Sequence, residues 1–514
     1  MGVYRNPILP GSNPDPSVCR VGDEYFMVTS TFEYLPGLPV HRSTNLVDWE
    51  TIGHVIHRPG QLDYTGISAS KGLYAPTIRY HDGVFHVVCT VIPGEGAQPQ
   101  RSGHFLVTAT DPAGPWSDPV WFDGIGGIDP SLTFDGDRVW LCGTELQEPG
   151  AWVGQCDVWL TELDRHTFAA IGPRITIWQG ALLGAGWAEG PHIYRHRDGG
   201  WMLLAAEGGT DRDHAICVAY AETITGPYVG DVGNPRLTHR FLGDRAPIAN
   251  IGHADLVDTP DGHTFAVMLG TQQDAGVNSL CGRQTHLVPV EWERGRPLFA
   301  PGTGRVDLLM EADAVPNQAP RDTLIRDEFG EGELDHAWNA VRWHPQEFVS
   351  LTPHGIRLAA TADEPTAVVR TAFMGRRVPQ DHAELTAWVR LEPEGGDLRG
   401  GLLLRTTETA LVELYVDASG AGAVSLVDDG VATHVCRFGS TPGERIELTM
   451  RLDRHALTLV VDAVEVATID VTELATGRVL WFLGSWFGPF AVGSGSLAVE
   501  AVELRMLPDM VAQP

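Results

Sequence analysis

Short runs of alternating apolar and polar residues fill the chain from about residue 13 to residue 300. The runs at residues 25–28 and 85–88 are typical of half-buried β-strands, in which successive side chains point to opposite faces of a sheet. Turns rich in Gly and Asp, such as those at residues 81–83 and 198–200, separate the runs. Patterns with a helical period are scarce, so we predict an all-β chain.

A fivefold repeat organises these strand runs. Each repeat opens with a short acidic or Pro-containing phrase, and the openings lie at residues 15, 75, 129, 189 and 253, which are 60, 54, 60 and 64 positions apart. A period of about 50–60 residues with several strands in each unit is typical of a β-propeller, so five openings predict five blades whose equivalent positions meet around one axis. A β-sandwich array would also explain short strands and turns, but not acidic residues that recur at one phase of the repeat.

The repeat ends near residue 300, where Pro and Gly accumulate at residues 300–304 and Pro recurs at residues 315–320. We place a linker at residues 306–322, between a propeller over residues 1–305 and a second domain over residues 323–514. The second domain also alternates apolar and polar residues between Gly and Asp turns, but without the blade period. The predicted fold is therefore an all-β, five-bladed β-propeller followed by a lectin-like β-sandwich.

Length and charge narrow the class of protein. The chain has 514 residues, too many for one ordinary core, which agrees with two domains. The formal net charge of −30 argues against nucleic acids and anionic membranes as partners, because both are bound through basic surfaces. The same negative charge could serve solubility alone, so it argues against these two kinds of partner but does not indicate which ligand the protein binds. No run of about 18 apolar residues is present, and we expect no membrane-spanning helix.

Seven cysteines are spread along the chain without any C-x-x-C pair, so a zinc site is not expected. Most of them lie in apolar runs, as buried free thiols do, which suits a reducing compartment. The N-terminus lacks a basic segment followed by an apolar one, the pattern of a secretory signal. We therefore expect a cytoplasmic protein, and the sequence leaves open whether it forms a homo-oligomer.

Three of the five openings carry an acidic residue: Asp15, Asp129 and Glu189. Asp15 stands between two prolines, and on its own this phrase is typical of a turn. The recurrence of acids at the same phase favours a site, because the blades bring these residues to one axis. Glycoside hydrolysis requires two carboxyl groups in different protonation states, one to protonate the departing sugar oxygen and one to deprotonate water.

The surroundings of the three acids suggest how they share this work. We assign Glu189 as the general acid, because it is the longest of the three and the neighbouring Trp187 could raise its pKa. Asp15 is assigned as the general base. Asp129 is assigned as the group that tunes the pKa of Glu189 and orients it, since a third carboxylate nearby helps to keep an acid protonated.

Five further residues could bind a sugar. Phe32, Tyr34 and Tyr74 could stack on a sugar ring, although aromatic residues in such positions commonly belong to the core. Arg283 could bind vicinal hydroxyls or a catalytic carboxylate, or be a solvated strand residue. His253 could be a core histidine, or hold a water or a calcium ion. Because calcium prefers oxygen ligands, His253 is a weak candidate for a structural calcium site; we expect no required cofactor and no other metal.

Five phrases of the chain resemble the motifs of glycoside hydrolase family 43. The resemblance extends over nearly the whole chain and is nearest to the two-domain members with a C-terminal β-sandwich, mostly β-xylosidases and α-L-arabinofuranosidases. The phrases are NPDPS at residues 13–17, TFEYLPG at 31–37, GIDPS at 127–131, AEGPH at 188–192 and GHA at 252–254.

The resemblance implies a five-bladed propeller and an inverting mechanism, with the base at Asp15, the pKa modulator at Asp129 and the acid at Glu189. It also implies that Arg283 binds the terminal sugar and that Phe32 helps to wall its subsite.

In such members a loop of the C-terminal domain closes the pocket, and the stretch at residues 485–488 is the candidate here. Trp486 and Phe487 are therefore predicted to contact the substrate. A closed pocket implies that one terminal sugar is removed, rather than that a chain is cut internally.

The predicted function is an inverting exo-glycosidase that removes terminal β-1,4-linked xylose from xylo-oligosaccharides. The first alternative is an α-L-arabinofuranosidase acting on arabinoxylan or arabinan oligosaccharides, or an enzyme with both activities. A lower-ranked alternative is a non-catalytic carbohydrate-binding propeller. Many family members carry Trp where this chain has Tyr74, and residues 145–150 match no family pattern, so the choice between the two sugars stays open.

Overall fold

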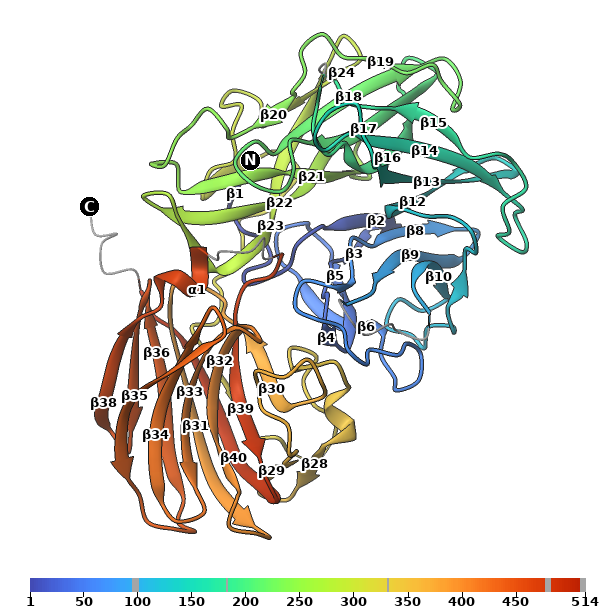
Figure 1. Cartoon of the computed structure of the whole chain (residues 1–514). Helices are drawn as coiled ribbons and strands as arrows, with labels where there is room; N and C mark the ends of the chain where they lie inside the picture. Colours follow the sequence, from blue (N-terminus) through green and yellow to red (C-terminus); the bar gives the residue numbers. More distant parts are fainter. Residues whose placement is uncertain (95–100, 182–183, 331, 477–481, 509–514) are drawn as a thin grey trace.

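The computed structural model describes all residues except 95–100, 182–183, 331, 477–481 and 509–514, and is built almost entirely from β-strands (Figure 1). Five antiparallel sheets of four or five strands follow one another along the first 300 residues. Each sheet uses strands that are consecutive in the chain, apart from β4 (Tyr34–Leu35), which the first sheet leaves out, and the prediction of a five-bladed β-propeller is confirmed.

The first two blades contain β2 (Ser17–Val21), β3 (Glu24–Val28), β5 (Gly37–Ser43) and β6 (Glu50–Ile56), then β7 (Gly72–Leu73), β8 (Thr77–His81), β9 (Val84–Ile92), β10 (Gly103–Ala109) and β11 (Val120–Trp121). The third contains β12 (Ile128–Asp135), β13 (Arg138–Leu146), β14 (Cys156–Leu163) and β15 (Ile175–Trp178). The fourth contains β16 (Glu189–Arg195), β17 (Trp201–Glu207), β18 (Ala215–Ala221), β19 (Val229–Gly230) and β20 (Leu237–Thr238). The fifth contains β21 (Ile248–Asp258), β22 (Thr264–Asp274), β23 (Val277–Glu293) and β24 (Arg296–Phe299).

Apolar side chains fill the space between neighbouring blades. Met202 and Ile216 of the fourth blade share one buried cluster with Phe265 and Val288 of the fifth. Both faces of each sheet can be buried in this way only when blades stand on either side, which is why the repeat closes into a ring.

The ring closes through the segments that flank it. β1 (Gly2–Arg5) pairs with β25 (Leu309–Ala312), so part of the predicted linker is a strand held against the N-terminus. The backbone N–H of Ile8 donates to the carbonyl of Thr285 in the last blade. These contacts join the two ends of the propeller sequence.

Asp255 ties the innermost strands of several blades together. Its side chain is fully buried, and its Oδ2 accepts hydrogen bonds from Ser17 Oγ at 2.7 Å and from Arg79 Nη1 at 2.9 Å. The Tyr194 hydroxyl donates to Oδ1. Burial alone would raise the pKa of Asp255, but the Arg79 guanidinium and the other donors hold it below its ordinary value. The strands that carry the predicted site are therefore fixed to one another.

Residues after the propeller form two eight-stranded sheets that pack face to face, confirming the β-sandwich (Figure 1). One sheet contains β26 (Leu324–Asp327), β28 (Val349–Thr352), β29 (Gly355–Ala359), β31 (His382–Pro393), β36 (Ile446–Asp453), β37 (Ala456–Val461), β38 (Val464–Asp470) and β40 (Gly495–Met506). The other contains β27 (Asn339–Val341), β30 (Ala372–Arg377), β32 (Arg399–Thr407), β33 (Ala410–Asp417), β34 (Ala421–Asp428), β35 (Val431–Gly439), β39 (Trp486–Val492) and β4 (Tyr34–Leu35). The predicted end of this domain at residue 514 lies outside the described residues.

β4 crosses from one domain to the other. It lies between β3 and β5 of the first blade in the chain, yet it pairs with β27 at the edge of a sandwich sheet. The sandwich thus extends its sheet with a strand from the propeller sequence, and the two domains share backbone hydrogen bonds.

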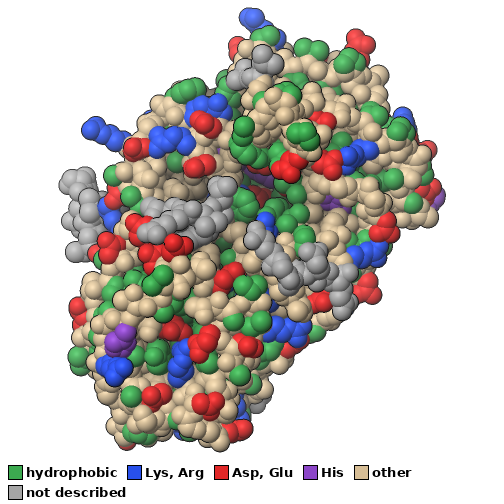
Figure 2. All heavy atoms as spheres, viewed as in Figure 1, with side chains coloured by type: hydrophobic (Ala, Val, Ile, Leu, Met, Phe, Trp, Pro, Cys, Tyr) green, Lys and Arg blue, Asp and Glu red, His purple; other side chains and the backbone are tan. Residues whose placement is uncertain are grey.

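Charged side chains are spread over the face of both domains that Figure 2 shows, with Asp and Glu interspersed among Lys and Arg. Within the described part of the chain, no helix has the length and apolar character that crossing a membrane requires. The helix α1 (Thr472–Thr476) has five residues.

Candidate active site

A pocket of about 230 Å³ opens where the blade openings meet, and it contains the three predicted acids. Phe482 from the sandwich completes its wall, so both domains build it. The lining residues are Asp15, Phe32, Tyr74, Ala75, Ile128, Asp129, Trp187, Glu189, Gly208, Gly209, Thr210, Asp211, His253, Arg283 and Phe482. The structure thus brings together Asp15, Asp129, Glu189, Phe32, Tyr74, His253 and Arg283.

Unusual backbone conformations aim these side chains. Asp15, Asp129 and His253 have φ angles of 54°, 55° and 50°, in the left-handed region that non-glycine residues rarely adopt. The register between inner and second strands shifts just after Ile128 in blade three and around Gly252 in blade five. A bulge re-aims a side chain out of the regular alternation of a strand, and strained residues of this kind cluster at functional sites.

Asp15 is held by donors on both carboxylate oxygens. Its side chain is buried, Ser30 Oγ donates to Oδ2 at 2.6 Å, and Arg283 Nη1 donates to Oδ1 at 3.0 Å. The same Arg283 Nη1 also lies 3.0 Å from Thr210 Oγ1. These contacts fix the orientation of the Asp15 carboxylate at the pocket floor.

The surroundings of Glu189 disfavour its ionisation. Burial and the nearby carboxylates of Asp129 and Asp15 raise its pKa to about 8, against a smaller opposing effect of Arg283. At neutral pH Glu189 is therefore mainly protonated and can donate a proton to a bound group.

Asp129 acts on Glu189 through the neighbouring backbone and through its own charge. Its Oδ2 accepts a hydrogen bond from the backbone N–H of Gly190 at 3.0 Å, which links it to the residue after Glu189. Burial raises the pKa of Asp129, His253 opposes this, and Asp15 raises it further. Asp129 is thus placed both to orient the Glu189 backbone and to disfavour a charge on its carboxyl.

Three aromatic rings wall the pocket. Phe32 lies 5.1 Å from Tyr74 and 5.7 Å from Phe482 between ring centroids, and Tyr74 lies 5.8 Å from Phe482. Arg283 packs against this wall, with its guanidinium 5.6 Å from the Phe32 ring and 5.2 Å from the Phe482 ring. An apolar wall beside a charged floor suits a ligand with one apolar face and several hydroxyls, as a sugar ring has.

Contrary to the prediction, Trp486 and Phe487 are not pocket residues. They begin β39, which lies between β30 and β32, so their side chains are committed to the sandwich and its interface. Trp486 is fully buried and stacks on Tyr34 with ring centroids 3.9 Å apart, and Phe487 belongs to the sandwich core. The aromatic residue that reaches the pocket is Phe482, just before this strand, and its carbonyl accepts a hydrogen bond from Arg283 Nε at 2.9 Å.

Several lining residues carried no clear signal in the sequence. Thr210 and the glycines before it follow β17, in a loop that no repeat position marks. Trp187 stood out only as a neighbour of Glu189, yet its side chain is 42% exposed at the pocket rim and its φ angle is 47°. Residues 145–150, which match no family pattern, do not contribute to the lining.

His253 is nearly buried, and its Nδ1 lies 4.0 Å from Asp15 Oδ1. Gly190 approaches so closely that a Cβ there would meet the His253 ring at 2.9 Å. Among the residues that the structure describes, no three His, Cys, Asp or Glu side chains are grouped to hold a metal ion. A calcium ion at His253 stays a prediction, and the position of this residue in the pocket lining is what the structure adds.

Comparisons with known proteins agree with this geometry. The model of glycosyl hydrolases family 43 matches residues 4–297, and the model of the beta xylosidase C-terminal concanavalin A-like domain matches residues 326–501. A xylosidase/arabinosidase of Butyrivibrio fibrisolvens is 34% identical over 96% of this chain and 97% of its own length. A non-reducing end alpha-L-arabinofuranosidase of Bacteroides ovatus is 35% identical over 96% of this chain and 92% of its own.

Solved structures show the same two-domain arrangement. The Bacteroides ovatus Xyloglucan PUL GH43B structure superposes with a TM-score of 0.89 and 31% identity, covering 98% of this chain and 100% of that one. A xylan beta-1,4-xylosidase from Bacillus halodurans gives a TM-score of 0.88 and 28% identity over 98% and 100% of the two chains. The likeness covers both domains, and the chain therefore belongs to glycosyl hydrolase family 43 and is a glycoside hydrolase.

Proposed function

We propose that this protein is an inverting exo-glycosidase that removes single pentose units from the non-reducing ends of oligosaccharides. Terminal β-1,4-linked xylose is the proposed main substrate, and α-L-arabinofuranose the second. The observation that carries the proposal is the pairing, in one small pocket, of a Glu189 carboxyl protonated at neutral pH with a firmly oriented Asp15 carboxylate.

The proposed chemistry divides the reaction between these two groups. Asp15 takes a proton from a water molecule as the water oxygen attacks the anomeric carbon. Glu189 gives its proton to the glycosidic oxygen as the bond from that oxygen to the anomeric carbon breaks. Because water attacks the face opposite the leaving group, the configuration inverts in a single step. Asp129 keeps Glu189 protonated until the leaving group needs the proton.

The shape of the pocket supports removal of a terminal sugar. Phe32, Tyr74 and Phe482 form one continuous wall, and Phe482 comes from the second domain. A pocket of about 230 Å³ has room for one pentose ring rather than for a length of polysaccharide. Arg283 offers its guanidinium to hydroxyls on the ring that lies against this wall.

The descriptions of the relatives support activity on both xylose and arabinofuranose. One relative is described as a xylosidase/arabinosidase and another as an alpha-L-arabinofuranosidase. Both sugars present similar hydroxyls, so we propose one site with both activities and a preference for xylose. The proposed enzyme needs no cofactor; its cytoplasmic location and its oligomeric state stay predictions.

Hydrolysis of nitrophenyl β-xyloside and nitrophenyl α-L-arabinofuranoside tests the proposal. The wild-type protein should cleave both, and Asp15→Ala should lower kcat by about 100-fold or more, the size of a lost general base. Glu189→Ala should lower kcat less on nitrophenyl glycosides than on xylobiose, because nitrophenol is a good leaving group that needs little protonation. The control is Asp137→Asn, which changes an exposed turn residue paired with Arg165.

Two outcomes would contradict the proposal. Absence of hydrolysis of either glycoside, with retained binding of xylose, would favour the carbohydrate-binding alternative. Undiminished activity in Asp15→Ala would remove the proposed base. The sugar released first from a branched arabinoxylo-oligosaccharide decides between the two pentoses.

A further inference from the structure

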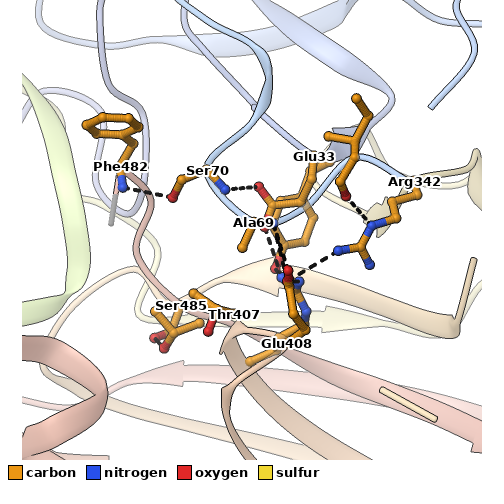
Figure 3. Close-up of polar contacts among 12 residues, drawn as sticks. Glu33, Ala69, Ser70, Arg342, Thr407, Glu408, Phe482 and Ser485 are labelled. Atoms are coloured by element: carbon orange, nitrogen blue, oxygen red, sulfur yellow. Dashed lines mark hydrogen bonds and ion pairs between the residues drawn. The ribbon is translucent and has the colours of Figure 1, made fainter. Parts of the chain in front are cut away.

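Two of the three aromatic residues that wall the pocket, Tyr74 and Phe482, are hydrogen-bonded to a single residue, Ser70. The Tyr74 hydroxyl donates to the Ser70 carbonyl at 3.0 Å. The backbone N–H of Phe482 donates to Ser70 Oγ at 3.0 Å (Figure 3). Ser70 is buried and has a φ angle of 60°, so its backbone is held in a left-handed conformation. One wall residue of the propeller and one of the sandwich are thus attached to the same point.

A carboxylate from each domain holds this point. Glu33 of the propeller accepts the backbone N–H of Ser70 at 3.0 Å, and Glu408 of the sandwich accepts that of Ala69 at 3.1 and 3.3 Å (Figure 3). We call residues 69–70 the strap. The backbone N–H groups of Ala69 and Ser70 therefore each bind a carboxylate that is itself held in place. Together these two hydrogen bonds stabilise one conformation of the strained strap.

Buried arginines bind the two carboxylates to each other. Arg405 Nη1 lies 3.1 Å from Glu33 Oε1, and its Nη2 lies 2.9 Å from Glu408 Oε2. Arg342 Nη2 donates to Glu408 at 3.2 Å, and its Nε donates to the carbonyl of Ile67 just before the strap. Glu33, Arg342 and Arg405 are at most 1% exposed and Glu408 is 9% exposed. The charges of the two glutamates and the two arginines balance. A buried cluster of this kind tolerates little displacement, because separating one partner leaves a buried charge uncompensated.

None of these four charged residues lines the pocket. They lie behind its wall, at the junction where β4 joins the sandwich sheet, and the catalytic acids depend on other contacts. Asp15 is held by Ser30 and Arg283, and Asp129 by the backbone of Gly190. The charge cluster can therefore influence where the wall stands without touching the groups that transfer protons.

We infer that Glu33 and Glu408 are positioning residues, which act through the strap on Tyr74 and Phe482 and thereby set the affinity of the pocket for the terminal sugar. The inference rests on the proposed function and deepens it: the sandwich domain controls sugar binding from a distance. We expect the wall to contribute equally to binding before and during bond cleavage, because it carries none of the groups that transfer protons. Loosening it should then raise KM and leave kcat largely unchanged.

Ser70→Ala is the mildest test, because it removes the acceptor of the Phe482 N–H and keeps the Ser70 carbonyl that Tyr74 uses. We expect KM for the nitrophenyl glycosides to rise about fivefold, the effect of one neutral hydrogen bond, with kcat within about twofold of wild type. Glu408→Gln keeps the shape of the side chain but leaves the two arginines short of one charge. It should raise KM further, by about tenfold, since hydrogen bonds to charged groups are the stronger ones.

A matched control is available within the sandwich. Glu413 on β33 is a buried glutamate paired with Arg399 on β32 at 3.1 Å, so Glu413→Gln breaks a similar ion pair that does not involve the strap. It should lower the melting temperature without changing KM. If Ser70→Ala and Glu408→Gln leave KM at the wild-type value and lower only the melting temperature, as Glu413→Gln does, the role of the cluster is structural and the inference is wrong.

Failure of the proposed function would be visible separately. If the wild-type protein hydrolyses neither glycoside, the proposed function fails, and the inference is then tested by calorimetric titration with xylose and with arabinose. Weaker binding by Ser70→Ala than by wild type and Glu413→Gln supports the positioning role, and equal binding by all three overturns it. Ser70→Ala removes one hydroxyl and no charge, so the test does not depend on the folding of Glu408→Gln.

Discussion

The protonation state of Glu189 is the central feature at the scale of single residues. Burial and two neighbouring carboxylates disfavour its charge and raise its pKa to about 8. In the reaction that we propose, the acid must hold its proton at neutral pH and release it only to the leaving oxygen. The arrangement of three acids on three blades supplies that property.

The pH dependence of activity follows from this shift. Because Glu189 must be protonated, kcat/KM should fall as the pH rises above about 8. Asp129→Asn removes one of the negative charges that raise the pKa of Glu189, so this alkaline limb should move to lower pH, and kcat at neutral pH should fall. A pH profile of nitrophenyl xyloside hydrolysis for both proteins measures the shift. A limb that stays in place would show that Asp129 does not tune Glu189.

The same shift has a consequence for stability. The folded-state pKa of Glu189 lies above its unfolded value, so its contribution to stability is present in acid and is lost as the pH rises from about 4.5 through about 8. Glu189→Gln cannot ionise and should therefore raise the melting temperature at pH 8 by about 2 °C or more, with less effect at pH 5. Calorimetry at the two pH values tests this. An equal change at both would mean that ionisation is not the cause.

At the scale of elements, the alternation of apolar residues and the repeat of the openings predicted the blades and the meeting of Asp15, Asp129 and Glu189. They did not predict the left-handed backbones and register shifts that turn these side chains toward the axis, because bulges leave no mark in a period-two pattern. Phe482 was missed for a related reason. The alternation of apolar and polar residues does not define where a strand begins. Because β39 begins at Trp486, the two aromatic residues predicted for the pocket belong to the sandwich instead.

Two substitutions separate these aromatic residues. Trp486→Ala removes a fully buried ring stacked on Tyr34 and should lower the free energy of unfolding by about 3–5 kcal/mol. Phe482→Ala should leave stability nearly unchanged and raise KM about tenfold, because this ring walls the pocket. Thermal melts and steady-state kinetics of both variants test the assignment. The opposite pattern would restore the sequence-based prediction that Trp486 contacts the sugar.

At the scale of the whole molecule, the two domains form one functional unit. β4 extends a sandwich sheet, Phe482 completes the pocket, and the charge cluster around Arg405 joins Glu33 to Glu408 across the junction. The sequence predicted two domains and a linker, and the family resemblance implied a sandwich loop at the pocket. Neither identified the residues that make these contacts, since they depend on which surfaces meet after each domain has formed. The linker prediction itself missed β25.

A fragment of residues 1–322, which keeps β25 paired with β1 but lacks the sandwich, tests this unity. Without the sandwich, β4 loses its partner strand, the pocket loses Phe482, and Glu33 loses its ion pair with Arg405. We expect a poorly soluble fragment with no measurable hydrolysis of nitrophenyl xyloside, assayed at the concentration of the full chain. A soluble fragment with the wild-type KM would show that the propeller alone builds the sugar site.

Acid should also weaken the junction between the domains, where His54 of the propeller and His336 of the sandwich lie 5.7 Å apart between ring centroids. Burial lowers the pKa of His41 to about 3 and that of His344 to about 4, and His54 is lowered as well. Histidines kept neutral in this way give stability above their unfolded pKa of about 6.5 that is lost as the pH falls through the folded values. The melting temperature should therefore fall steadily from pH 6.5 to pH 4. His54→Gln should flatten this slope, whereas His166→Gln, at an exposed position, should not; equal slopes in all three proteins would exclude these histidines as the cause.

The most direct test of the account is the configuration of the sugar first released. With Asp15 as a base and no covalent intermediate, hydrolysis of a β-xyloside should yield α-xylose first, followed by slow mutarotation to the equilibrium mixture. Proton NMR of the anomeric signals during the first minutes of the reaction measures this. Initial appearance of β-xylose would show retention, and would contradict the roles proposed for Asp15 and Glu189.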